Sequence, residues 1–404
     1  MTVMEDWIEA YLDCRRRKRN TASAIAYEVD YLSRLVDLCE RVNDRSYRPS
    51  RSIAFVVRKP RYREVFAADF SDRVVHHYIS LRLEPLFEEV FNERTFNCRK
   101  GKGTQYGVRR LYDDIRECSQ GYARDCYVAK FDLRGFFMSI DKRLMVSLVD
   151  DFIVERYDGS DKEDLRYLCR ITIEHNPEED CIRRSPASYW EMLPPNKSLF
   201  TNGTGKGMPI GNLPSQLFAN FLLNGLDWFV ERSGFRYHGR YVDDFYLVHE
   251  EKERILSFAP RIREYLSFLH LELHPHKFYL QHYSKGASFI GSTVKFGRLY
   301  VNRVSLSNLR RAVLRLNRKC NASNVHSLVA SVNCYLGLMR TGKCYACRRS
   351  SLGLLDSRAF RFVYVCGHHE KLSVRREYKQ SIRIKDAVRK GKVFIPSLAN
   401  GVAG

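Results

Sequence analysis

"GRYVDDFYLV", residues 239–248, is the stretch that decides the fold, because two adjacent carboxylates interrupt a run that otherwise favours a strand. The residues on either side of the pair are β-branched, aromatic or aliphatic, which is typical of a buried strand. Asp243 and Asp244 carry like charges that such a strand buries only at a cost. The run therefore predicts a strand whose two aspartates have a purpose other than packing.

A second strand-like stretch, "CYVAKFDLRGFFMSID" at residues 126–141, carries Asp132 within its apolar part. Asp141 is expected to be the N-cap of the next helix, because apolar residues recur at helical spacing after it. Lys130 and Arg240 lie near the aspartates in sequence, but two cations are too few to neutralise three carboxylates gathered in one place. Asp132 and the adjacent pair are thus the charges that need an explanation.

A divalent cation would explain the three carboxylates. Carboxylate oxygens suit Mg²⁺, which binds a few protein oxygens together with substrate phosphates. Two ions about 4 Å apart activate an attacking hydroxyl and stabilise a leaving pyrophosphate. The alternative is that Asp243 and Asp244 only cap a hairpin turn, since Asp favours turns.

Composition points to a folded, basic protein. The 404 residues are 44% hydrophobic, enough for two or three domains, and no apolar run of membrane-spanning length is present. The net charge is +21, from 68 Lys and Arg against 47 Asp and Glu, which favours a polyanionic partner such as a nucleic acid over a merely basic protein. The N-terminal stretch lacks the pattern of a secretory signal, so we expect a soluble, cytoplasmic protein.

The 12 cysteines are scattered, which indicates reduced thiols. Cys344 and Cys347 form a C-x-x-C pair, and Cys366 and His368 follow it, so a structural zinc site is one interpretation. An ordinary thiol pair on or near a helix is the other.

Several local patterns predict elements of the fold. Residues 22–43 are expected to form one helix, with the apolar stripe Ile25, Val29, Leu32, Val36 and Cys39. Residues 51–70 predict a β-hairpin that presents Arg58, Lys59, Arg61 and Arg63, either as a phosphate-binding finger or as a solvated face.

Other segments are less regular. Residues 98–105, "CRKGKGTQ", form a basic Gly-rich loop that is not a Walker A sequence. Residues 154–204 are polar and irregular and look like an insertion. Residues 205–227 predict a Gly/Pro loop followed by a helix, on which Gln216, Asn220 and Asn224 form a polar stripe that lines a nucleotide site or faces water.

In their order along the chain, these segments resemble the reverse transcriptases. "YVDDF" is similar to the Y-x-D-D box of that family, and "FDLRGFFMSID" to its first catalytic-aspartate motif. "DRVVHHYISLRLEPLFEEVF" with "NCRKGKGT" resembles its fingers segments, "LELHPHKFYLQ" its later palm motif with a lysine, and "KGASFIG" its primer grip. The resemblance is colinear from about residue 25 to residue 291.

One loop resembles a subgroup of the family. The order I-G-x-x-x-S-Q in "IGNLPSQ", residues 210–216, is similar to the enzymes of diversity-generating retroelements, and so is "WEMLPPNKSLF" at residues 190–200. This subgroup implies an enzyme, bacterial or phage-encoded, that copies a template-repeat RNA into cDNA with errors opposite adenines, for mutagenic retrohoming. It also implies a small helical partner, the accessory variability determinant.

The family resemblance implies roles for particular residues. Asp132, Asp243, Asp244 and the Leu133 carbonyl would hold two Mg²⁺ ions, for which Mn²⁺ substitutes, and Lys277 would neutralise the leaving pyrophosphate. Phe137 would exclude a 2′-hydroxyl. The other implied residues contact the nucleotide (Arg63, Lys59, Arg73, Ile210, Gly211 and Gln216) or grip the primer (Phe289, Ile290 and Gly291).

The implied fold is α+β, a right-hand polymerase with fingers, an antiparallel palm sheet and a helical thumb. Its expected parts are N-terminal helices and fingers (1–120), palm (121–291, with the insertion at 154–204), thumb (292–385) and a basic tail (386–404). Template RNA, primer and dNTPs are the implied partners. Two alternatives stay open: a reverse transcriptase of a bacterial defence, retron or group II intron-like system, and a non-catalytic RNA-binding scaffold.

Overall fold

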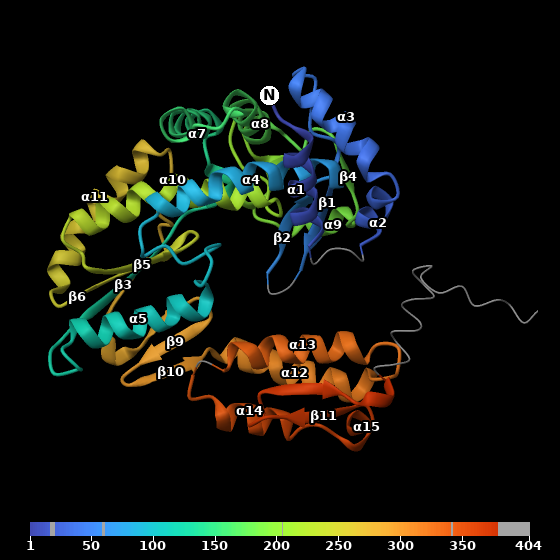
Figure 1. Ribbon diagram of the computed structural model, residues 1–404. Helices are drawn as coiled ribbons and strands as arrows, with labels where there is room; N and C mark the ends of the chain where they lie inside the picture. The colour runs from blue at the N-terminus through green and yellow to red at the C-terminus, as the bar shows by residue number, and fades with distance from the viewer. Residues whose placement is uncertain (17–20, 59–60, 204, 341, 379–404) are drawn as a thin grey trace, which may run out of the picture. The chain divides into compact units, whose positions relative to one another are not determined.

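The computed structural model describes residues 1–16, 21–58, 61–203, 205–340 and 342–378, so the expected basic tail lies outside the described residues. The chain divides into two compact units, residues 1–281 and 282–404, each with a hydrophobic core (Figure 1). The first unit contains helices α1 (Met4–Arg15), α2 (Ala22–Glu28), α3 (Tyr31–Asn43), α4 (Phe70–Val90), α5 (Thr104–Cys118), α6 (Phe136–Ser139), α7 (Lys142–Arg156), α8 (Lys162–Glu174), α9 (Ala187–Glu191), α10 (Leu213–Arg232) and α11 (Lys252–Phe268). Its strands are β1 (Ser52–Val57), β2 (Arg63–Ala67), β3 (Tyr127–Asp132), β4 (Cys181–Arg183), β5 (Tyr237–Tyr241), β6 (Asp244–His249) and β7 (Tyr279–His282).

The stretch at residues 239–248 lies in a sheet with the strand order β5-β6-β3-β7. β6 pairs antiparallel with both β3 and β5, so Asp132 lies opposite Asp244. Side chains alternate along a strand: Leu247 joins the main core, whereas the hydroxyl of Tyr246 donates to Asp114 of α5 at 2.7 Å. Helix α5 therefore packs on one face of the sheet, and the core packs on the other.

The expected basic hairpin is confirmed, and the segment after it is more ordered than its sequence suggests. β1 and β2 pair antiparallel, and β4 adds to β1 in parallel register. Residues 154–204 thus contain helix α8, which packs on α7, and a strand of the hairpin's own sheet. The expectation that this segment is irregular is wrong, because Leu165, Leu168 and Ile173 give α8 a buried apolar face.

The N-terminal region also differs from its prediction. Residues 22–43 form two helices, α2 and α3, that are separated at Val29 and Asp30. Most of the expected apolar stripe is exposed (Ile25, Val29, Leu32 and Val36), and the buried residues lie on another face (Ala24, Tyr27, Leu35, Leu38 and Val42). The helical period of the pattern was right, but the break at Val29 and Asp30 separates it into two helices that pack through another face.

The second unit is built from short strands and helices. Helix α12 is basic: its Leu309, Val313 and Leu316 enter the core of this unit while its arginines face outward. The elements of this unit are β8 (Ala287–Phe289), β9 (Ser292–Lys295), β10 (Arg298–Val301), α12 (Arg303–Lys319), α13 (Val325–Leu338), α14 (Tyr345–Leu352), α15 (Ser357–Phe360), β11 (Val363–Cys366) and β12 (Lys371–Val374).

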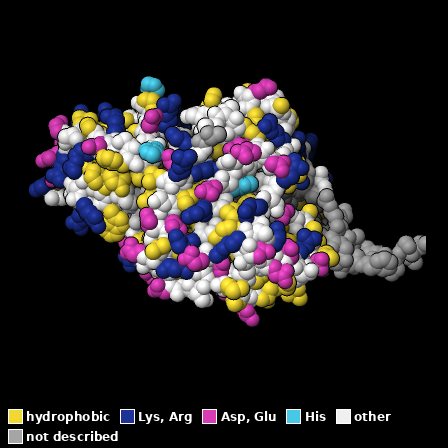
Figure 2. Space-filling model, turned by 90° about the horizontal axis from the view of Figure 1, so that it is seen from above, with side chains coloured by type: hydrophobic (Ala, Val, Ile, Leu, Met, Phe, Trp, Pro, Cys, Tyr) yellow, Lys and Arg dark blue, Asp and Glu magenta, His cyan; other side chains and the backbone are white. Residues whose placement is uncertain are grey.

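Charge and hydropathy complete the description. On the face shown in Figure 2, Lys and Arg side chains are interspersed with Asp and Glu, so the net charge of +21 is not gathered into one patch there. Among the described residues, every helix is too short or too polar to span a bilayer.

Candidate active site

Two strands and a tight turn, rather than one strand, carry the adjacent aspartates. β5 ends at Tyr241 and β6 begins at Asp244, and these residues face each other in the antiparallel register. Val242 and Asp243 therefore form a two-residue hairpin turn. The expectation of one continuous strand is wrong, and the alternative of a hairpin turn describes the local geometry.

The register brings three carboxylates to one end of the sheet. Asp132 ends β3 opposite Asp244, and Asp243 precedes Asp244 in the turn. Burial raises the pKa of Asp243 to about 6, and the negative charges of Asp244 and Asp132 add to the rise. Burial also raises the pKa of Asp244. Like charges gathered in a half-buried place have this effect on one another.

Two lysines offset more of this charge than the sequence suggests. Lys277 Nζ lies 2.6 Å from Asp132 Oδ1, and Lys130 Nζ lies 3.3 Å from Asp244 Oδ1. The guanidinium of Arg240 is directed to Asp227 instead of to the cluster. Of the two cations that lie near the aspartates in sequence, only Lys130 pairs with one of them; the second lysine, Lys277, is the one that the family resemblance implied for the site.

The donor set at this end of the sheet fits a divalent cation, although the described residues contain no group of three or more His, Cys, Asp or Glu that is arranged to hold one as it stands. The fit rests on the burial and the mutual repulsion that together raise the pKa of Asp243. Leu133 directly follows Asp132, and hydrogen bonds hold the backbone on both sides of it. The Asp132 carbonyl accepts from His274 N–H at 2.8 Å, and Arg134 N–H donates to the Glu272 carbonyl.

Residues expected to shape a nucleotide pocket meet at a small apolar cluster. Phe137 of α6 and Ile210 both pack against buried Phe66 of β2 and its neighbours. The Ile210 carbonyl accepts from Phe66 N–H at 2.9 Å. Gly211 has φ of +119°, and a Cβ there would approach the Phe66 carbonyl oxygen to 2.9 Å, so the close approach of the two segments requires glycine.

The expected triphosphate ligands Arg63, Arg73 and Lys59, and the expected pocket residue Gln216, differ in their surroundings. Arg63 is exposed at the start of β2. Arg73 is occupied in α4, where its Nε donates to the Ala68 carbonyl at 2.9 Å. Gln216 accepts from the thiol of Cys98 at 2.8 Å. Lys59 lies outside the described residues.

A buried glutamate that the sequence analysis missed anchors residues 190–200. Glu64 of β2 is 1% exposed. Its carboxylate accepts from Trp190 Nε1 (2.8 Å), Ser198 Oγ (2.7 Å) and Leu199 N–H (2.7 Å). The alternation of β2 could have revealed it, because Glu64 and Phe66 occupy the same face of the strand.

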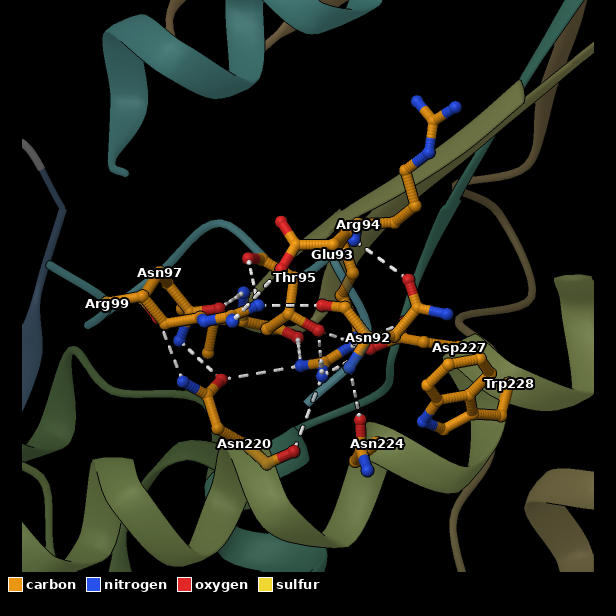
Figure 3. Close-up of polar contacts among 12 residues, drawn as sticks. Asn92, Glu93, Arg94, Thr95, Asn97, Arg99, Asn220, Asn224, Asp227 and Trp228 are labelled. Atoms are coloured by element: carbon orange, nitrogen blue, oxygen red, sulfur yellow. Dashed lines mark hydrogen bonds and ion pairs between the residues drawn. The ribbon is translucent and has the colours of Figure 1, made fainter. Parts of the chain in front are cut away.

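Two of the three residues in the polar stripe on α10, Asn220 and Asn224, neither face water nor line a nucleotide site, whereas Gln216 is exposed. Asn220 and Asn224 are buried and bond to the segment of residues 90–97, as Figure 3 shows for Asn97 and Asn92. Buried amides require partners on both sides. Sequence spacing located the stripe correctly, but only the fold shows what it meets.

In the second unit, the expected primer-grip residues form a tight turn. Phe289 is buried at the end of β8, and Ile290 and Gly291 have φ of 45° and 77° between β8 and β9. The register pairs Phe289 with Ser292, so Ile290 and Gly291 form the whole loop between the two strands.

The expected zinc site is not formed by the described residues. Cys344 is buried just before α14, which contains Cys347. The Cys366 thiol lies at the end of β11 and donates to Ser373 Oγ at 3.1 Å. Arg348 of α14 donates to the His368 carbonyl at 3.4 Å, so the two segments are adjacent, but the described residues bring no three metal-ligating side chains together there.

Comparison with solved structures gives distant similarities. One is apo telomerase from Candida Tropicalis, with 11% identity and a TM-score of 0.48 over 83% of this chain and 58% of that chain. Another is telomerase from Candida albicans in complex with the TWJ fragment of telomeric RNA, with 10% identity and a TM-score of 0.44 over 82% of this chain and 62% of that chain. The chain therefore spans only about three fifths of these proteins. No curated protein matches it.

A family model gives the decisive comparison. The model "Reverse transcriptase (RNA-dependent DNA polymerase)" matches residues 57–294, which is more than half of the chain and includes all three aspartates. The helices and antiparallel sheets described above agree with the α+β, right-hand polymerase fold of that family. The chain therefore belongs to the reverse transcriptases.

Proposed function

We propose that this protein is an RNA-directed DNA polymerase that extends a primer on an RNA template with dNTPs. The observation that carries the proposal is the hairpin register, which gathers Asp132, Asp243 and Asp244 at one end of a sheet. The family match supports the same activity, and a non-catalytic scaffold would gain nothing from the burial and repulsion that raise the pKa of Asp243.

Members of this family use divalent metal ions, and the three carboxylates, with the Leu133 carbonyl, are the groups that would hold them. Two Mg²⁺ ions would supply charge stabilisation for both the attacking and the leaving oxygens. Lys277 neutralises Asp132 at 2.6 Å in the present structure. Once released from that contact, its ammonium group would be available to hold the leaving pyrophosphate.

Nucleotide selection would depend on the apolar cluster around Phe66. Phe137 would lie beneath the sugar and exclude a 2′-hydroxyl by its bulk. Ile210, Gly211 and Gln216 would shape the pocket around the templating pair. Arg63, with Arg73 and Lys59, would bind the triphosphate through charge-assisted hydrogen bonds. The exposure of Arg63 at the base of the basic hairpin supports this role.

For the biological role, we propose a diversity-generating retroelement, in which the template is a template-repeat RNA and errors occur opposite adenines. The loop "IGNLPSQ" supports it, because its Ile210 packs in an apolar cluster and offers a base pair no amide hydrogen bond. A small helical accessory protein as partner and a cytoplasmic location belong to the same proposal. Residues 190–200 are the second stretch that resembles the subgroup, and their hydrogen bonds to Glu64 support a structural role for this stretch.

The test is primer extension on an RNA template with Mg²⁺ and dNTPs, followed by sequencing of the product. Extension that Asp243→Asn lacks supports the polymerase, and errors concentrated opposite adenines support the retroelement role. The Ile210→Gln variant should reduce those errors selectively. Accurate copying by the wild type would place the enzyme in a defence, retron or intron-like system. A wild type that extends no primer, even with native RNA and accessory protein, would contradict the proposal.

A further inference from the structure

The hairpin that carries Asp243 contains a residue in an unfavourable backbone conformation. Val242 has φ of 60°, although it is β-branched. Two-residue hairpin turns with positive φ at this position favour glycine, because a Cβ crowds the backbone there. Such a conformation persists only where the surroundings hold it.

Two side chains hold both polar groups of the Val242 backbone. Asn97 Oδ1 accepts from Val242 N–H at 2.8 Å, and Arg240 Nη1 donates to the Val242 carbonyl at 3.1 Å. Because a backbone N–H only donates, the oxygen of the Asn97 amide must face it, and its Nδ2 must point elsewhere.

Asn220 of α10 is the hydrogen-bond partner of the Asn97 Nδ2 group. Asn97 Nδ2 donates to Asn220 Oδ1 at 2.6 Å, and Asn220 Nδ2 donates back to the Asn97 carbonyl at 2.9 Å. Figure 3 shows the two amides facing each other. Asn97 is 2% and Asn220 1% exposed, so water does not compete for these bonds.

Arg240 is fixed as firmly. It is 1% exposed, and its Nε and Nη2 form a fork on the carboxylate of Asp227, which is 3% exposed, with a shortest distance of 2.7 Å. Thr95 Oγ1 donates to the same carboxylate at 2.6 Å. A planar guanidinium held at both nitrogens has little freedom, so its third nitrogen reaches Val242 in one direction only.

We propose that Asn97, Asn220, Asp227 and Arg240, here called the hairpin latch, hold Val242 in this turn and thereby set the position of Asp243, and that Asn97 is a positioning residue for polymerisation. The latch connects helix α10 and the segment before α5 to the turn, so the carboxylate is placed by buried side chains of the scaffold. This inference rests on the proposed function for its kinetic part and on geometry for its structural part.

The test is a double-mutant cycle between Asn97→Ala and Val242→Gly. Glycine adopts positive φ without strain, so a turn that contains it has less need of the latch. We expect Asn97→Ala to lower kcat about tenfold, with little change in the KM for dNTP, and to raise the Mg²⁺ concentration for half-maximal activity. The double variant should recover most of both losses relative to Val242→Gly alone. Asn97→Ser serves as a milder variant if Asn97→Ala does not fold.

Asn224→Ala is the matched control. Asn224 is a buried amide one turn further along α10, and it bonds to Asn92 N–H at 2.9 Å and to the Val90 carbonyl at 3.0 Å. Its removal should lower the melting temperature about as much as Asn97→Ala, because each change removes a buried amide. It should show no coupling to Val242→Gly.

A second cycle, in melting temperature without metal or substrate, separates this inference from the proposed function. Coupling between Asn97 and Val242 in melting supports the latch even if the wild type does not polymerise, a result that would contradict only the proposed activity. Additive effects of Asn97→Ala and Val242→Gly on both melting and kcat would overturn the latch, and so would equal coupling for Asn224.

Discussion

Replacing Asp243 with asparagine should stabilise the folded protein while it removes activity. Burial and the neighbouring carboxylates raise the pKa of Asp243 from 3.8 to about 6. Each unit corresponds to about 1.4 kcal/mol, so the ionised carboxylate costs the folded state up to about 3 kcal/mol above pH 6. Because Asp132 and Asp244 share in this repulsion, we expect the variant to gain about 1–3 kcal/mol in its free energy of unfolding.

The sign of the pH dependence follows from the direction of the shift. The folded state holds the Asp243 proton more tightly than the unfolded state, so the cost is absent below about pH 4, grows between about pH 4 and pH 6, and is constant above that. Urea unfolding of wild type and Asp243→Asn in EDTA, at pH 4.5 and at pH 8, measures the difference. The gain should be present at pH 8 and small at pH 4.5.

Asp158→Asn is the control for this comparison. The Asp158 side chain is 98% exposed, so removing its charge should change the free energy of unfolding neither at pH 4.5 nor at pH 8. Added Mg²⁺ should stabilise the wild type more than Asp243→Asn, because binding to the folded state shifts the equilibrium by mass action. A variant that is less stable than the wild type at pH 8, or a difference that is independent of pH, would refute the reasoning.

Three further changes test neighbouring parts of the site. Phe137→Ala should lower the preference for dNTP over NTP in kcat/KM at least about tenfold, because the bulk that excludes the 2′-hydroxyl is removed; competition between the two nucleotides measures it. Glu64→Ala should destabilise the protein by about 2–4 kcal/mol, since three buried donors lose their acceptor, and Trp190 fluorescence should report the release of its segment. Lys277→Ala should lower kcat about 10²-fold with little effect on primer binding, as single-turnover kinetics would show.

The chemistry of the site was more predictable than its scaffold. Asp132 and the adjacent pair were identifiable because carboxylates are rare in strand-like sequence, and a local rule is enough to see that. The Asp141 cap was identifiable because apolar residues follow it at helical spacing, and the structure confirms it: its side chain accepts from Leu144 N–H at 3.0 Å.

Long-range partners could not be predicted from local pattern. Lys277 and Asp132 are 145 residues apart, and Glu64 and Trp190 are 126 apart, so neither spacing carries a signal. The amide stripe on α10 was visible, but a helix exposes or buries a polar stripe according to what packs there. The apolar stripe at residues 22–43 shows the same limit, because its spacing predicted a helical face but not that this face is exposed.

The most direct test of the central claim is the rate of incorporation of a single dNTP on a primed RNA template, for wild type, Asp132→Asn and Asp158→Asn. The account predicts Mg²⁺-dependent incorporation by the wild type and by Asp158→Asn, and a loss of about 10³-fold for Asp132→Asn, because several kcal/mol of transition-state stabilisation depend on that carboxylate. Equal rates for Asp132→Asn and wild type would contradict the claim that the three gathered carboxylates carry the chemistry.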